Sequence, residues 1–179
     1  MKRTTFAILA ALAVLIAPAA ARADVFSVTA DLPVAYSFDD GGSADSVSGF
    51  KAGVSLPFLI GFGLENYTVT DKDDSGSEAS VDFTFLDLFV NLPVPFVNIV
   101  LGVGAGAVTG DLKDSPAKLE NTTATQYFVS LGIPIAAVFD VHVGYHWVQA
   151  KADITVDGDK IDQAKLDGNM TSVGIKVGF

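Results

Sequence analysis

Two histidines are the side chains of this sequence best suited to acid–base or metal chemistry. His142 and His146 are its only histidines, and they stand four residues apart. In an extended strand, with a rise of about 3.3 Å per residue, they share a face but lie about 13 Å apart, too far to bind one metal ion. Catalysis by either ring would need a serine and a carboxylate beside it. The spacing therefore favours polar packing over chemistry.

An acidic stretch offers a candidate cation site. Asp71, Asp73, Ser75 and Asp82 occupy positions 1, 3, 5 and 12 of a calcium-binding loop. Against a calcium site, an aspartate replaces the usual bidentate glutamate at the last position, and the flanking segments alternate like strands. The sequence predicts a solvated acidic loop without a tightly bound cofactor, and loosely bound calcium is the alternative.

Further polar residues interrupt apolar segments at alternate positions. Together with the two histidines they are Asp31, Lys51, Glu65, Asp87, Asp140, His142, His146 and Lys176. A charge that leaves water must be paired, and the two lysines have carboxylates available as partners. We expect these side chains to form a structural network in a polar interior.

Eight segments carry this alternation, and each sets an apolar face against a face of small and polar residues. They cover residues 24–38, 49–56, 59–69, 80–91, 97–108, 126–133, 137–148 and 172–179. The connections are short and proline-bearing at 56–58, 91–96 and 132–136, but long and polar at 39–49, 70–80, 109–123 and 154–167. Short turns at one end and longer loops at the other are typical of membrane barrels. The sequence predicts an all-β, eight-stranded antiparallel up-and-down transmembrane β-barrel with short periplasmic turns and longer extracellular loops.

Two segments depart from strict alternation, and aromatic residues gather at the strand ends. Because Tyr67 changes parity after Asn66, and Phe85 is followed by an apolar Leu86, we expect a β-bulge at each point. The aromatic residues predict two interfacial girdles. They are Phe26, Phe58, Phe96, Phe139 and Phe179 near the short turns, and Tyr36, Phe50, Tyr67, Phe83, Tyr127 and Trp147 near the long loops.

The N-terminus has the order of a secretory signal peptide. Lys2 and Arg3 precede an apolar run at 6–17, and the small-residue pattern Ala-Arg-Ala follows at 21–23. The apolar run is too short to span a bilayer, so we expect cleavage of residues 1–23 and a single mature barrel domain at 24–179. Removing the three basic residues of this segment leaves 8 basic residues against 21 acidic ones, a formal charge of −13. Such a charge excludes nucleic acid as a partner.

The signal peptide, the eight amphipathic strands and the terminal phenylalanine together resemble the small eight-stranded outer-membrane β-barrel family of Gram-negative bacteria, of the OmpX and OmpA-transmembrane-domain type. In that family the barrel-assembly machinery reads a last strand that is apolar at alternate positions and ends on an aromatic residue. Val173, Ile175, Val177 and Phe179 match that pattern position by position. The resemblance implies an outer-membrane location, contact with outer-membrane lipids and lipopolysaccharide, and insertion by that machinery.

The sequence favours a monomeric, non-enzymatic outer-membrane protein with a structural or surface-interaction role through acidic extracellular loops. An eight-stranded barrel is narrow, and paired charges inside it would plug it. Two alternatives remain: an outer-membrane lipid-modifying enzyme using His142 or His146, and a narrow channel or small-ligand carrier. The position of the two histidines distinguishes the enzyme alternative from a non-enzymatic protein, because a catalytic histidine would lie at the lipid-facing surface beside a serine and an acid.

Overall fold

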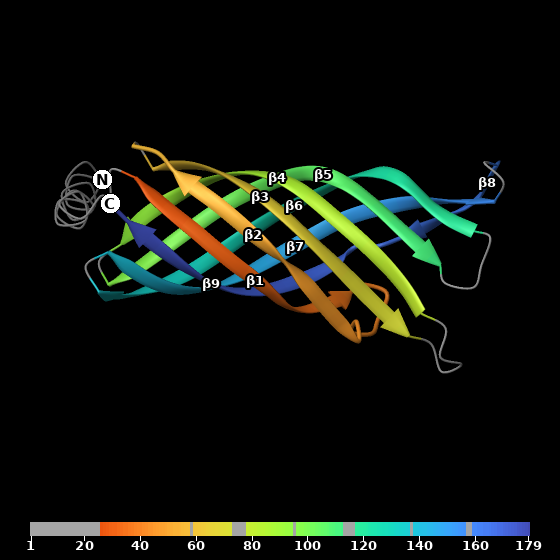
Figure 1. Ribbon diagram of the computed structural model, residues 1–179, viewed down its shortest axis with the longest axis horizontal. Helices are drawn as coiled ribbons and strands as arrows, with labels where there is room; N and C mark the ends of the chain where they lie inside the picture. Colours follow the sequence, from red (N-terminus) through yellow and green to blue (C-terminus); the bar gives the residue numbers. More distant parts are fainter. Residues whose placement is uncertain are drawn as a thin grey trace, which may run out of the picture.

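The wall of the molecule is a closed antiparallel barrel of eight strands (Figure 1). This computed structural model describes residues 26–57, 59–72, 78–94, 96–112, 117–136, 138–156 and 159–179. The wall strands are β1 (Ser27–Phe38), β2 (Ser46–Ser55), β3 (Ile60–Lys72), β4 (Glu78–Val94), β5 (Val97–Leu112), β6 (Ala117–Ala136), β7 (Phe139–Val156) and β9 (Gly168–Gly178). Each pairs with its sequence neighbour in the wall, and β9 closes the barrel against β1. The predicted fold class is confirmed, while the expected signal peptide at 1–23 lies outside the described residues.

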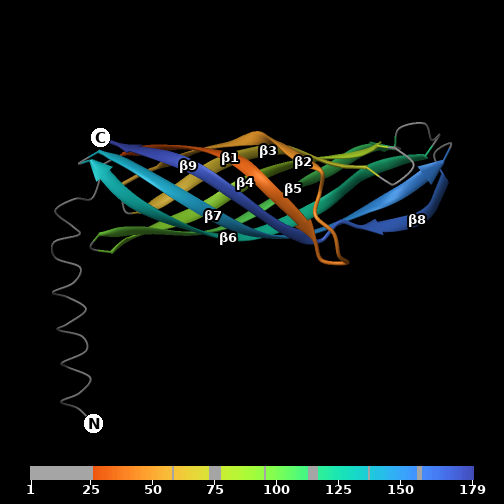
Figure 2. The same cartoon turned by 90° about the horizontal axis from the view of Figure 1, so that it is seen from below.

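One further strand, β8 (Asp159–Lys165), forms an arm with the end of β7. The pairing of β7 with β9 ends at Val148 and Gly168, and β8 takes over as the partner of β7 as far as Val156 and Asp159. The arm projects beyond the other strands at the end opposite the C-terminus (Figures 1 and 2). On its surface Lys160 donates a 2.6 Å hydrogen bond to Asp153, which holds the pKa of that carboxyl below its usual value.

Strands extend through much of what the sequence suggested were long loops. The ladder between β3 and β4 runs to Lys72 and Glu78, and the ladder between β5 and β6 runs to Asp111 and Lys118. The expectation of long polar loops at 70–80, 109–123 and 154–167 is therefore corrected, because the described residues of these segments mostly belong to strands. We call these strand ends, which extend beyond the apolar outer face, the raised hairpins. Polar residues are compatible with strands that stand above a membrane, since water can solvate both their side chains and the ends of the ladder.

Side chains alternate between the outside of the barrel and its interior, here called the lumen. The outward face carries a band of exposed large apolar side chains, which includes Leu32, Phe62, Leu86, Val103, Ile133, Val143 and Ile175. Toward the short turns the band continues to Phe96 and Phe179, which are 86% and 70% exposed. In the part of the chain that the structure describes, no helix is both long and apolar enough to cross a membrane.

The two β-bulges expected from the sequence are wrong. The register between β3 and β4 is continuous from Ile60 opposite Val90 to Lys72 opposite Glu78. Consequently Tyr67 and Phe83 point into the lumen and are fully buried, so they do not belong to an outer girdle. Tyr36 is buried as well, because the register with β9 shifts between Pro33 and Ala35. By contrast, Phe50 and Tyr127 of the predicted girdle do lie on the exposed outer face, where Tyr145, which the prediction did not include, lies as well.

These inward aromatic side chains form an apolar plug that fills the long-loop half of the lumen. Tyr67 and Phe83 stack with their ring centroids 4.9 Å apart, and Tyr36 packs against Phe83 at 5.7 Å. The plug is the main core of the molecule. Its buried members are Tyr36, Tyr67, Val69, Val81, Phe83, Phe85, Val108, Leu119, Ala124, Val148, Ala150, Ala152, Leu166 and Met170.

The wall is weakest between β1 and β2, and this makes a testable prediction. Their ladder runs only from Ser27–Ser55 to Asp31–Lys51, whereas β2 pairs with β3 along its whole length. Alternate amides in 46–50 therefore lack a ladder partner in β1. We expect these amides to exchange hydrogen at least about 100-fold faster than those of β5, which is paired on both sides. Hydrogen exchange read out by NMR checks this, and equal protection of both segments would contradict it.

Candidate functional site

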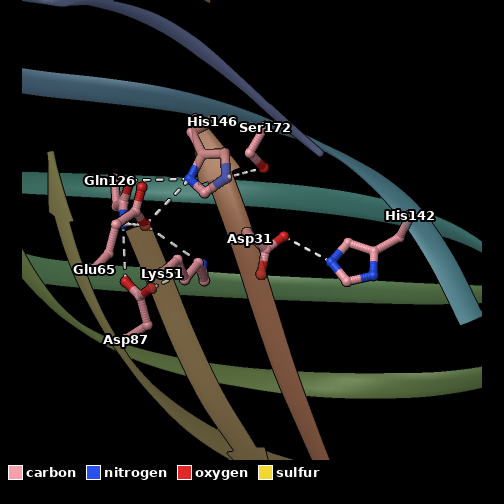
Figure 3. A network of polar contacts seen from close by, with 8 residues as sticks. All are labelled: Asp31, Lys51, Glu65, Asp87, Gln126, His142, His146 and Ser172. Atoms are coloured by element: carbon pink, nitrogen blue, oxygen red, sulfur yellow. Dashed lines mark hydrogen bonds and ion pairs between the residues drawn. The ribbon is translucent and has the colours of Figure 1, made fainter. Parts of the chain in front are cut away.

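Beneath the apolar plug, three strands bring a lysine and two carboxylates together in the lumen. Lys51 on β2 lies 2.8 Å from Oδ2 of Asp87 on β4 and 3.5 Å from Oε2 of Glu65 on β3. The Gln126 amide donates to both acids, at 2.8 Å to Glu65 and 2.9 Å to Asp87 (Figure 3). Lys51 also lies 3.3 Å from the centre of the Phe128 ring, a cation–π contact. We call Lys51, Glu65, Asp87 and Gln126 the lysine cluster.

His146 joins the lysine cluster from β7 and has the neighbours of a catalytic histidine. Its Nδ1 lies 3.1 Å from the Gln126 carbonyl and 3.6 Å from Glu65, and its Nε2 lies 3.3 Å from the Ser172 hydroxyl. Yet His146 is 1% exposed and Ser172 2%, and the imidazole stacks on Phe128 at 4.9 Å. A serine, a histidine and an acid thus meet inside the barrel. A lipid-modifying enzyme needs these groups at the lipid-facing surface, and here they are buried in the lumen.

A histidine–carboxylate contact and a lysine–carboxylate ion pair lie nearer the short turns. His142 Nε2 approaches Asp31 at 2.6 Å, apart from the lysine cluster (Figure 3). Lys176 lies 3.3 Å from Asp140, which also accepts a hydrogen bond from the Asn98 amide. Among the described side chains, each lysine and histidine that faces the lumen contacts a carboxylate, so these groups are arranged as pairs rather than as a ring lining an open pore.

A small cavity separates these pairs. It has a volume of about 30 Å³ and is lined by groups that include Thr29, Asp31, Lys51, Asn98 and His142. Ligand pockets usually measure about 300–1,000 Å³. The cavity is suited to water and is too small for an organic substrate.

Lumen glycines make room for the rings of this region, and one of them provides a prediction. A Cβ on Gly102 would overlap the Phe128 ring that contacts both Lys51 and His146. Gly102→Ala should therefore destabilise the barrel by about 1–3 kcal/mol through overpacking. Gly132→Ala is the matched control, since its Cβ would lie 3.3 Å from the nearest atom, on His142. Urea unfolding in lipid vesicles measures both, and an equal effect of the two variants would contradict the packing around Phe128.

The residues that the sequence suggested for an interior network all lie on the lumen side. The structure divides them into the lysine cluster with His146, the contact between His142 and Asp31, and the ion pair between Lys176 and Asp140. Sequence reasoning missed Gln126, Ser172 and Phe128 as members of this site. Their alternation with outward residues such as Tyr127 placed them in the lumen, but nothing in the sequence indicated that they touch the charged groups.

The candidate calcium residues are only partly described. Asp73 and Ser75 lie outside the described residues. Asp82 alternates with buried Val81 and Phe83, so it faces outward, where it accepts a 2.5 Å hydrogen bond from Thr68. Asp71 shares the parity of the inward Val69. Among described side chains, no group of three or more histidines and acids is arranged to hold a metal ion, and calcium stays a prediction.

The last strand has the apolar outward face that the sequence suggested. Val173 and Ile175 are exposed on the outside, and Phe179 exchanges backbone hydrogen bonds of 2.8 and 3.4 Å with Phe26. Their rings lie 6.2 Å apart. Phe179 thereby fastens the end of the chain to its neighbour across the closure, and the role of Val177 and its neighbours as an assembly signal is a prediction.

Comparison with solved structures supports the fold. No protein-family model matches the chain, and no curated protein matches it in sequence. The crystal structure of Neisserial surface protein A is similar, with a TM-score of 0.58 and 16% identity over 86% of this chain and 97% of that one. The solid-state NMR structure of outer membrane protein AlkL in lipid bilayers has a TM-score of 0.50 and 14% identity over 87% and 90% of the two chains. The chain thus has the fold of the small eight-stranded outer-membrane barrels, as the resemblance implied.

Proposed function

We propose that this chain is a non-enzymatic protein of the Gram-negative outer membrane whose lumen is closed and which acts through its outer surface. The observation that carries this proposal is the filling of the lumen. The apolar plug occupies one half, and paired charges occupy the other around a cavity of about 30 Å³. A channel or carrier needs a continuous path or a pocket, so the narrow-channel alternative is the less favoured one.

The proposal places the short turns in the periplasm and the raised hairpins outside the cell. The signal peptide would direct export, the barrel-assembly machinery would insert the chain as a monomer, and lipid and lipopolysaccharide would surround the apolar band. Supporting this, exposed apolar side chains cover the outward face, and exposed acids such as Asp39, Asp45 and Asp159 gather at the far end. A structural envelope role and a surface interaction through these acidic hairpins both fit such an arrangement. Loosely bound calcium at Asp71 and Asp82 belongs to the same proposal.

The absence of an enzymatic role is proposed from the burial of the candidate groups. His146, Ser172 and Glu65 would need a path for a lipid chain through the wall or the plug, and each is at most 2% exposed. His142 Nε2 is held by Asp31 at 2.6 Å, and among the described residues no serine hydrogen-bonds to this ring.

Cysteine labelling tests the location and the orientation together, since the chain has no native cysteine. Ile161→Cys places a thiol on the exposed arm, and Val138→Cys places one at an exposed short turn. On intact cells an impermeant maleimide should label only the arm, and both sites should react after the outer membrane is opened. Labelling of the short turn on intact cells, or recovery of the chain in the soluble periplasm, would overturn the proposal.

A further inference from the structure

Above the apolar band, the outward face of the barrel changes abruptly to uncharged polar side chains. On β3 the outward residues pass from Leu64 to Asn66, and on β4 they pass from Leu86 to Thr84 at the same rungs of the ladder. The other strands make a similar change within a few residues of this level, while Phe50 on β2 and Ala107 on β5 are still apolar opposite Asn66 and Thr84. The resulting collar consists of Ser37, Ser48, Asn66, Thr68, Thr70, Ser80, Asp82, Thr84, Thr109, Thr123, Thr125, Gln149, Asn169 and Thr171.

The collar is almost free of charge, although the hairpins above it are acidic. Among the collar positions whose side chains the structure describes, Asp82 is the only ionisable one, and its carboxylate accepts a hydrogen bond from Thr68. Cross-strand hydrogen bonds order the collar on this side, at 2.8 Å from Asn66 to Thr84 and 3.2 Å between Thr70 and Ser80. The collar positions themselves carry no lysine or arginine, the residues that recognise anionic lipid phosphates. Described cations border the collar, among them Lys151, which follows Gln149 on the outward face of β7, and Lys165, its ladder partner at the base of the arm.

The interior changes in the opposite sense at the same level. Where the outward face turns polar, the inward face turns apolar, as at Tyr67 and Phe83. Such a reversal marks the level at which the outer surroundings change from hydrocarbon to a polar medium. From Asn66 to Thr70 the collar rises roughly 10 Å along tilted strands, which is comparable to a headgroup layer.

The other end of the barrel lacks an equivalent collar among its described residues. There the outward apolar side chains continue to the turns, with Leu56, Leu59, Ile135 and Val138 all exposed. The protein would therefore present different chemistry to the two leaflets. Its short-turn end has only a thin polar interface, and its other end has a deep layer of uncharged, hydroxyl-bearing side chains.

We infer that the collar is a contact surface for the sugar hydroxyls of outer-leaflet glycolipid headgroups. Hydroxyl and amide side chains both donate and accept hydrogen bonds, as sugar hydroxyls do, and they make no demand for phosphate. The inference rests on the proposed outer-membrane function and extends it by naming the chemistry that the outer surface recognises.

The single tryptophan is a built-in reporter for this contact. Trp147 is the only tryptophan of the chain, lies on the outward face and pairs with Tyr127 and Asn169 on its two neighbouring strands. Gln149 and Thr125 form the next rung above it. Lipids that bind the collar will displace other lipids from the neighbourhood of the Trp147 ring.

The test measures quenching of Trp147 by brominated phosphatidylcholine mixed with a competing lipid. Uncharged digalactosyl diacylglycerol should compete two- to tenfold better than plain phosphatidylcholine, which corresponds to about one net hydrogen bond. Anionic phosphatidylglycerol should give no preference. The variant Thr123→Val/Thr125→Val should abolish the preference for the sugar lipid, whereas Ser130→Ala, which removes a buried lumen hydroxyl, should retain it.

Three results would overturn the collar as a sugar contact. They are equal competition by all lipids, stronger competition by phosphatidylglycerol than by the galactolipid, and an unchanged preference in the double valine variant. A chain that shows no quenching by membrane-embedded bromine has not inserted, and that outcome contradicts the proposed function instead.

Discussion

Replacing Lys51 with methionine should destabilise the folded barrel by about 3–5 kcal/mol. Lys51 is the only lysine or arginine that contacts Glu65 and Asp87 among the described residues, at 3.5 and 2.8 Å, and all three side chains are at most 8% exposed. Methionine keeps most of the side-chain volume but leaves two acids buried without their cation. Urea unfolding in lipid vesicles, followed by the heat-dependent migration of the folded band, measures the loss.

Two further variants separate the charge effect from packing. The double variant Lys51→Met/Asp87→Asn removes one of the two buried carboxylates that lose their cation. It should therefore recover a substantial part of the stability that Lys51→Met alone loses. Lys151→Met removes a lysine on the exposed arm, and we expect a change within about 0.5 kcal/mol. If Lys51→Met were as mild as Lys151→Met, the lysine cluster would not be a paired, water-poor site.

The second large effect concerns the apolar plug. Phe83→Ala should cost about 3–5 kcal/mol, because the ring is fully buried and packs against Tyr36, Tyr67 and Phe85. The cavity left behind is surrounded by other large side chains that cannot collapse into it easily. Chemical unfolding in the same vesicles provides the measurement.

Phe62→Ala is the matched control on the adjacent strand. Phe62 belongs to the outward band and is 52% exposed, so its removal leaves a gap that lipid can fill. We expect at most half the loss found for Phe83→Ala. Equal losses at the two positions would mean that Phe83 does not contribute to a packed core.

The closed barrel follows from sequence pattern, because lipid and lumen impose opposite polarity on successive residues of a strand. The pattern of β5 illustrates this, with Leu101 and Val103 outside and Gly102 and Gly104 inside. A period of two over eight segments, with turns of alternating length, leaves few other folds. The position of the charged residues in the lumen comes from the same alternation.

The apolar plug could not be predicted in the same way. At Asn66 and Tyr67 the polarity of the two faces reverses while the register of β3 continues. In sequence a reversal and a one-residue bulge look alike, since both move apolar residues to the other parity. A register shift does occur elsewhere, between Pro33 and Ala35 of β1, and it carries Tyr36 from the outer face into the lumen.

Which lumen side chains contact one another depends on three-dimensional geometry, and the hydropathy pattern of the sequence does not specify it. Lys51 is opposite Glu65 in the ladder, yet its shortest ion pair is with Asp87, two strands away. His146 meets Gln126 and Ser172 as diagonal neighbours on β6 and β9, the two strands that flank β7. Barrel closure and side-chain packing create these contacts, so a list of lumen residues from sequence says nothing about which of them touch.

Conductance in a planar bilayer tests the central claim that the lumen is closed. Refolded protein, whose insertion is verified by its heat-modifiable band, should give no steady single-channel openings, because the apolar plug and the paired charges leave no continuous aqueous path. Reproducible openings of one defined conductance would contradict the closed lumen and with it the proposal that the protein acts only through its outer surface.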